Sequence, residues 1–186
     1  TTGITADDTD TSRALGPRWG DVYNVKDFGA KGTGTDNDTT AVTNALDSNR
    51  PVYFPKGTYL LSPWTEYVAD SDVIIFSDAQ AVIKGTSVKD FIRPAGGDVT
   101  ISGITFDTWR KVIENSATDA GTTDFLNVHD CEFLNTSGDG VIDHERPLNR
   151  CEIRNNYFKT IDSKCIRIGR DVYSEQDTWK RISITH

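Results

Sequence analysis

Methionine is absent from the 186-residue chain, and cysteine and histidine occur only three times each. Cys131, Cys151 and Cys165 lack the close pairing of a zinc site and are too few for a disulfide scaffold. They are expected to be small apolar or turn residues of a protein that folds in a reducing compartment. No second ligand type recurs at a fixed offset from the histidines. The sequence therefore predicts neither a metal site nor a cofactor.

Positive charge and long apolar runs are also scarce. The chain has 28 acidic and 20 basic residues, a net charge of -8, and its basic residues are scattered. This excludes nucleic acids and anionic membrane surfaces as expected partners. No apolar run approaches the roughly 20 residues of a membrane span, and the polar first residues lack signal-peptide character. The missing initiator methionine indicates a processed or trimmed piece of a longer protein.

The first third of the chain changes its periodicity several times. Residues 1–20 have no hydrophobic period and are interpreted as an extended arm or linker. Alternation predicts a short strand over residues 21–26, and helical spacing predicts an amphipathic helix over 36–48. Strands are expected over 52–54 and 58–61, on either side of a Pro-Lys-Gly turn.

The stretch DFGAKGTGTDND, residues 27–38, contains three glycines followed by three acids or amides. A phosphate-binding loop would need Lys after its last glycine, and an EF-hand would need a Gly and a later Glu that are absent. The glycines are therefore expected to shape a turn, and Asp36 or Asp38 to cap the following helix.

An eight-residue frame ending in Phe recurs as VTISGITF, LNVHDCEF and CEIRNNYF at residues 99–106, 126–133 and 151–158. The final ISITH, residues 182–186, begins a fourth copy. The Phe residues that end the frames are 27 and 25 residues apart. A period of this length is typical of solenoids, in which each repeat forms one coil. The frames predict two inward stacks: one of Ile101, Val128, Ile153 and Ile184, and one of Phe106, Phe133 and Phe158.

Residues 24–46, NVKDFGAKGTGTDNDTTAVTNAL, and 52–61, VYFPKGTYLL, resemble the N-terminal motif of pectate-lyase-like right-handed parallel β-helix proteins, which include phage tailspikes and capsule depolymerases. The resemblance implies an all-β, single-stranded parallel β-helix whose open end is covered by a short helix. Residues 21–62 would form this cap and 63–186 the coils. Because the chain would stop in mid-strand, it is expected to be a fragment.

A second strand follows each frame, at residues 111–115, 140–144 and 164–169. With Ile113, Ile142 and Ile166 inward, alternation directs Glu114, Asp143 and Arg167 outward on one face. Neighbouring strands lie about 4.8 Å apart, so adjacent coils can supply carboxylate pairs with the roughly 5 Å separation of a retaining glycosidase or the roughly 6.5–9.5 Å of an inverting one. In a lyase, Arg167 could instead help to neutralise the sugar carboxylate. These residues are the catalytic candidates. The alternative is a row of charges that only contacts solvent.

Residues 137–144, SGDGVIDH, resemble the first motif of polygalacturonase-like enzymes, which makes Asp139 a further catalytic candidate. The next coil has Ser163 and Lys164 where those enzymes have an Asp pair, and their later motifs are missing. Trp109 could stack on a sugar ring or lie buried, and His144 is a candidate for the substrate groove.

By resemblance, the expected function is that of a homotrimeric phage tailspike, which binds and cleaves a bacterial surface polysaccharide by hydrolysis or β-elimination. It would work in the virion tail and contact other tail proteins through its N-terminal arm. Two alternatives remain: a non-enzymatic virion module that binds glycan, and a secreted pectinase-like enzyme.

Overall fold

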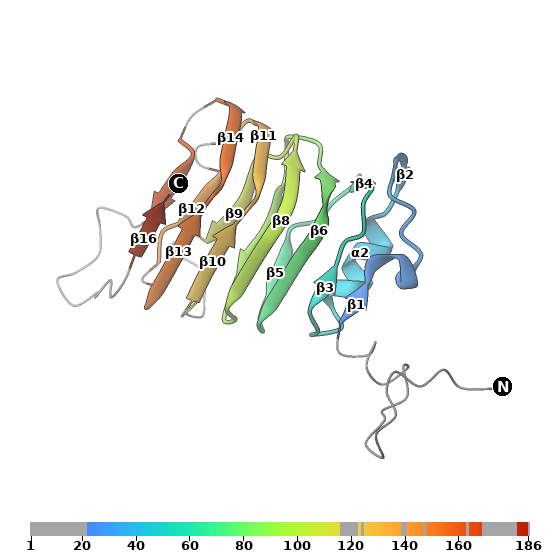
Figure 1. The fold of residues 1–186 in the computed structure, drawn as a ribbon, viewed down its shortest axis with the longest axis horizontal. Helices are drawn as coiled ribbons and strands as arrows, with labels where there is room; N and C mark the ends of the chain where they lie inside the picture. The colour runs from blue at the N-terminus through green and yellow to red at the C-terminus, as the bar shows by residue number, and fades with distance from the viewer. Residues whose placement is uncertain are drawn as a thin grey trace, which may run out of the picture.

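A computed structural model describes residues 22–115, 123, 125–138, 141–146, 148–162, 164–168 and 182–185. Its strands are stacked side by side along one axis, from the N-terminal cap to β16 (Figure 1). Every pairing among the described strands is parallel, and strands pair with their equivalents in adjacent coils. The prediction of an all-β parallel β-helix is confirmed.

In chain order the elements are β1 Tyr23–Asn24, η1 Val25–Phe28, β2 Thr33–Asn37, α2 Thr39–Leu46, β3 Val52–Tyr53, β4 Thr58–Leu60, β5 Tyr67–Ala69, β6 Val73–Lys84, β7 Asp90–Pro94, β8 Val99–Asp107, β9 Lys111–Asn115, β10 Phe125–His129, β11 Glu132–Thr136, β12 Ile142–His144, β13 Arg150–Arg154, β14 Tyr157–Ile161, β15 Ile166–Ile168 and β16 Ile182–Thr185. An 11-stranded sheet wraps around much of the coil, and a five-stranded sheet in the order β15-β12-β9-β7-β5 closes it. We call the smaller one the second sheet.

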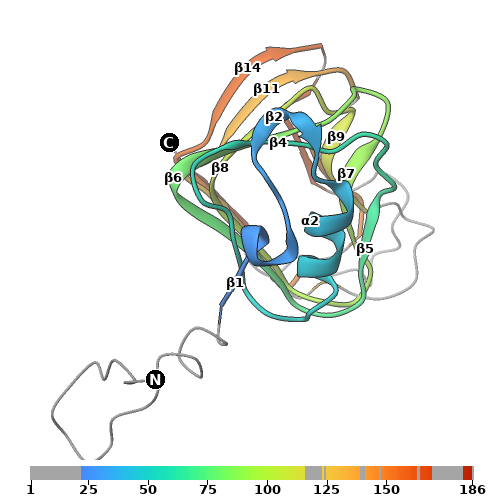
Figure 2. The same cartoon turned by 90° about the vertical axis from the view of Figure 1, so that its right-hand side faces the viewer.

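The predicted helix is present as α2, and it covers the N-terminal end of the coils (Figure 2). Its apolar face, Ala41, Val42, Ala45 and Leu46, is buried in the core. The expected capping by Asp36 or Asp38 is wrong: Asp38 occupies the N-cap position but makes no side-chain hydrogen bond to the helix, and the Asp36 carboxylate instead accepts from the Lys31 and Thr33 side chains. The Asp38 carboxylate accepts hydrogen bonds from the backbone amides of residues 31 and 32, at 2.7 and 3.0 Å.

The strand predicted over residues 21–26 is shorter than expected. Only Tyr23 and Asn24 pair as a strand, and a 3-10 turn begins at Val25 because the Asn24 side chain accepts the amide hydrogen of Lys26. Gly29 ends this turn with φ of 96°, a left-handed conformation that glycine adopts without steric cost. The residues that follow form β2, which the sequence pattern did not predict, and which pairs with β4.

The repeated frames bend in the middle, so each of the later two gives two strands. The bends lie at Asp130 and Asn155, whose φ angles are 56° and 54°. Asn156 ties adjacent coils together at this point: its amide donates to the Val128 carbonyl at 2.9 Å and accepts from the Cys131 amide at 3.0 Å. The recurring Asn and Asp of the frames are therefore turn residues.

The core is built from the predicted stacks. Ile101, Val128, Ile153 and Ile184 pair in register, as do the Phe residues that close each frame. The rings of Phe106, Phe133 and Phe158 stack with centroids 5.6 and 4.9 Å apart. Cys131 and Cys151 are buried and free, as expected for small apolar residues.

The expected arm, residues 1–20, lies outside the described residues. In the part of the chain that the structure describes, no helix is long and apolar enough to cross a membrane.

Candidate functional site

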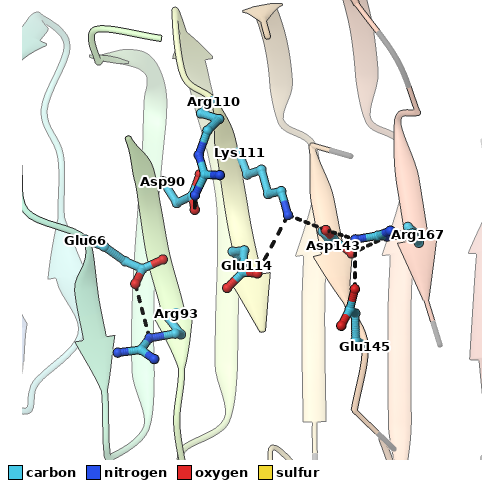
Figure 3. Close-up of polar contacts among 9 residues, drawn as sticks. All are labelled: Glu66, Asp90, Arg93, Arg110, Lys111, Glu114, Asp143, Glu145 and Arg167. Atoms are coloured by element: carbon cyan, nitrogen blue, oxygen red, sulfur yellow. Dashed lines mark hydrogen bonds and ion pairs between the residues drawn. The ribbon is translucent and has the colours of Figure 1, made fainter. Parts of the chain in front are cut away.

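Charged side chains from consecutive coils gather on the outward face of the second sheet (Figure 3). The predicted register is confirmed: Asp143 in β12 pairs with Glu114 in β9 and with Arg167 in β15, while Ile142 pairs with Ile113 and Ile166. Arg93 continues the row in β7 and pairs with Val68 in β5. The structure therefore brings the three predicted residues together, and their chemical role stays a prediction.

Asp143 is enclosed by two cations. Lys111 donates to Oδ2 of Asp143 at 2.5 Å, and Arg167 donates to both carboxylate oxygens, at 2.6 and 2.5 Å. The Asp143 side chain is completely buried, although its position in the strand is an outward one. Arg167 also donates to Glu145 at 2.9 Å. Such a carboxylate is suited to holding its neighbours in place, since neither oxygen remains available to a substrate.

Glu114 lies beside this cluster and is partly exposed. The Lys111 ammonium that binds Asp143 also lies 3.7 Å from Glu114 Oε1. One lysine therefore separates two carboxylates that would repel each other in adjacent strands. Glu114 differs from Asp143 in that 18% of its side chain is exposed to solvent, so it can be reached from outside.

Toward the N-terminal cap, Glu114 is joined by Glu66 and Asp90. One carboxylate oxygen from each of the three lies within 4.8 Å of the others. Arg93 pairs with Glu66 at 3.1 Å, and Arg110 pairs with Asp90. Oxygens of this kind could ligate a hard divalent cation. Each carboxylate already faces an arginine or lysine, however, and a metal ion would have to displace that contact.

Asp90 has the most unusual environment of the three. It is buried, and its Oδ1 has no hydrogen-bond partner among the described residues. Burial raises the pKa of the Asp90 carboxyl above its usual range, against the opposing effect of the Arg110 guanidinium. A carboxyl group with a raised pKa beside an accessible carboxylate suits acid–base hydrolysis of a glycoside.

Two predicted substrate-binding residues are corrected by their burial. Trp109 is fully buried, donates from Nε1 to the Ile83 carbonyl at 3.0 Å and packs against Phe91, so no sugar can stack on it. His144 is also fully buried, and its Nδ1 lies 3.0 Å from the Arg146 carbonyl. Burial lowers the pKa of His144 to about 4. Asp139 lies outside the described residues.

The sequence pattern missed Glu66, Asp90 and Lys111. Lys111 and Asp90 occupy the first positions of β9 and β7 and pair in register. Strict alternation would direct both inward with Ile92 and Ile113. The available signal was the charge itself, because a lysine or aspartate at an inward position of a solenoid needs a partner.

Known proteins resemble part of the chain. The family model described as rhamnogalacturonase A/epimerase, pectate lyase-like, matches residues 22–92. The chain belongs to the pectate-lyase-like parallel β-helix superfamily. No solved structure matches the chain significantly.

Alginate lyase 7 of Azotobacter vinelandii is 38% identical over 87 residues, which is 44% of this chain. The mannuronan C5-epimerase AlgE2 of the same bacterium is 33% identical over 98 residues, or 50% of the chain. A probable glucan endo-1,3-beta-glucosidase of Arthroderma benhamiae is 34% identical over 87 residues, or 36% of the chain. The match covers 10% of the length of each of these superfamily relatives.

Proposed function

We propose that the protein binds a polysaccharide along the second sheet and cleaves it there. The observation that carries this proposal is the group of Glu66, Asp90 and Glu114, whose oxygens lie within 4.8 Å of one another. This spacing suits a pair of hydrolytic carboxylates, which lie roughly 5 Å apart in retaining glycosidases. The names of the relatives, a lyase, an epimerase and a glucosidase, support a polysaccharide as the substrate.

Within this proposal, Glu114 and Asp90 have different roles. Burial raises the pKa of the Asp90 carboxyl, which favours this group as the acid that donates a proton to the leaving oxygen, and Arg110 lies beside it to stabilise the carboxylate that results. Glu114 is the accessible carboxylate and acts as the nucleophile or base. Lys111 lies 3.7 Å from Glu114 and also binds Asp143, which Arg167 binds in turn, so Asp143 and Arg167 act as positioning residues through Lys111.

β-Elimination is the second candidate, and a specific observation favours it. Four cations, Arg93, Arg110, Lys111 and Arg167, share the face with the carboxylates. A cation close to a uronate carboxylate would neutralise it, which makes the neighbouring proton easier to remove. One of the relatives is named an alginate lyase.

The biological setting that we propose is a phage tailspike that acts on a bacterial capsule, exopolysaccharide or lipopolysaccharide as a homotrimer in the virion tail. The motif at residues 24–46 and 52–61 supports this, because it resembles tailspike caps. Light scattering of the purified chain would show a mass three times that of the 20.6 kDa protomer if it assembles in this way.

Turnover tests the proposal. The chain is incubated with alginate, polygalacturonate, a β-1,3-glucan and bacterial capsular polysaccharides, and reducing ends and unsaturated products are measured. New reducing ends alone indicate hydrolysis, and ultraviolet-absorbing products indicate elimination. Glu114→Gln should lower the rate by about 100-fold or more, the usual contribution of an acid–base group.

The matched control is Glu132→Gln, which alters a carboxylate of the other sheet that accepts a bond from Thr105. This variant should retain full activity. Equal rates for Glu114→Gln and the native chain would contradict the assignment of the site. Binding of a polysaccharide without any product would favour the adsorption module over the enzyme.

A further inference from the structure

A groove lies between the capping helix and the strand that begins the second sheet. Thr39 and Thr43, one helical turn apart on α2, and Asp47 at its C-cap form one wall. Pro63 and residues 65–68 form the other. Its volume is about 410 Å³, which falls within the range of sites that bind small ligands.

The lining of this groove is rich in hydroxyl and carboxylate groups. Three threonines, Asp47 and Glu66 contribute polar atoms, and none of the lining residues is a lysine, arginine or histidine. The Thr39 hydroxyl donates to the Pro63 carbonyl at 3.0 Å, which ties the helix to the opposite wall. This hydrogen bond therefore connects the two walls of the groove.

Tyr67 and Val68 add apolar surface. The Val68 side chain is 37% exposed. Burial, together with the hydrogen bond to Asp47, raises the pKa of the Tyr67 hydroxyl to about 12, so this hydroxyl stays protonated and holds Asp47 in place. A sugar ring has an apolar face and a rim of hydroxyls, and the groove offers a matching surface to each.

We propose that this groove binds an uncharged sugar unit of the polysaccharide. Carboxylates accept strong hydrogen bonds from sugar hydroxyls, whereas they repel a uronate. Glu66 both lines the groove and belongs to the carboxylate group of the candidate site, so the groove and that site share this residue. The proposal rests on the proposed function, and it narrows the substrate to a polymer with a neutral unit at the cap end.

Binding of oligosaccharides tests this without requiring turnover. Laminaritetraose and cellotetraose serve as neutral probes and tetragalacturonate as the acidic one, titrated by calorimetry into the native chain, Thr43→Phe, Thr43→Arg and Asn44→Phe. Thr43→Phe fills the groove and should weaken binding of a neutral probe at least tenfold. Asn44→Phe, on the exposed side of the same helix, should leave it unchanged.

Thr43→Arg adds a cation and should improve binding of the acidic probe relative to the neutral one. The inference is overturned if neutral probes bind the native chain no better than tetragalacturonate, or if Thr43→Phe binds them as the native chain does. Turnover that persists in this case would leave the proposed function standing. If Thr43→Phe abolishes binding of a neutral probe but the native chain cleaves no polysaccharide, the proposal of the groove would be supported and the proposed enzymatic function contradicted.

Discussion

Replacing Asp143 by Asn should destabilise the protein strongly, because Asp143 is the fully buried centre of the charge cluster. Its Oδ2 receives donors from both Lys111 and Arg167. An amide in this place would keep one oxygen but turn its NH2 group toward one of these cations. Breaking a buried ion pair costs about 3–5 kcal/mol. Because the Arg167 side chain is 30% exposed and can regain water, we expect about 3 kcal/mol.

Urea unfolding followed by circular dichroism measures this effect. With a slope of about 2–3 kcal/mol per molar urea, the midpoint should fall by about 1–1.5 M. Adding Lys111→Met to Asp143→Asn removes the unpaired donor and should recover part of the loss, a coupling that a double-mutant cycle measures. A midpoint that Asp143→Asn leaves unchanged or raises would refute the reasoning, since removing a purely catalytic carboxylate often stabilises an enzyme.

Two further predictions concern stability. Burial lowers the pKa of His144 from 6.5 to about 4, so the protein should lose stability as the pH falls from 6.5 toward 4. The expected loss is about 3 kcal/mol. Urea midpoints measured across this pH range should show a much smaller loss for His144→Gln. A Cβ on Gly103 would lie 2.1 Å from the Ser77 carbonyl oxygen, so Gly103→Ala should lower the free energy of unfolding by about 3 kcal/mol, measured by thermal unfolding. Gly29→Ala is the control, with an expected loss of about 1 kcal/mol, because φ is also positive there but nothing lies within 4 Å of the added Cβ. Equal losses for the two variants would contradict this prediction.

The coils could be predicted from the sequence because the stacked positions carry the same residue types. Phe106, Phe133 and Phe158 recur at the end of each frame, and the ring stack requires them there. The same regularity gave the register of Glu114, Asp143 and Arg167. In a solenoid, contacts between residues that are far apart in the sequence can be predicted from the repeat, since each coil has the same environment as the one before it.

Burial at the strand starts could not be predicted in this way. Alternation assigns a direction to each side chain, but Phe91 and Ile92 are consecutive and both fully buried. Asp90 and Lys111 at the strand starts likewise belong to the charged cluster, and the only local signal of this is their charge at positions that alternation directs inward. Trp109 was ambiguous for a related reason: its indole is large and amphipathic, and only the packing against Phe91 and the Ile83 carbonyl decides that it belongs to the core.

The charged side chains of the second sheet are too deeply buried to be a row of charges in contact with solvent. Solvated charges extend into water and contribute little to stability when they pair. Here the exposed fraction of the side chain is 0% for Asp143, 10% for Lys111 and 18% for Glu114. Ordering these groups costs conformational entropy and desolvation, which a solenoid could avoid with neutral residues at the same outward positions. The low exposure of these side chains argues against a row of solvated charges, and their fixed arrangement, with one accessible carboxylate at its edge, supports the proposal of a preorganised site.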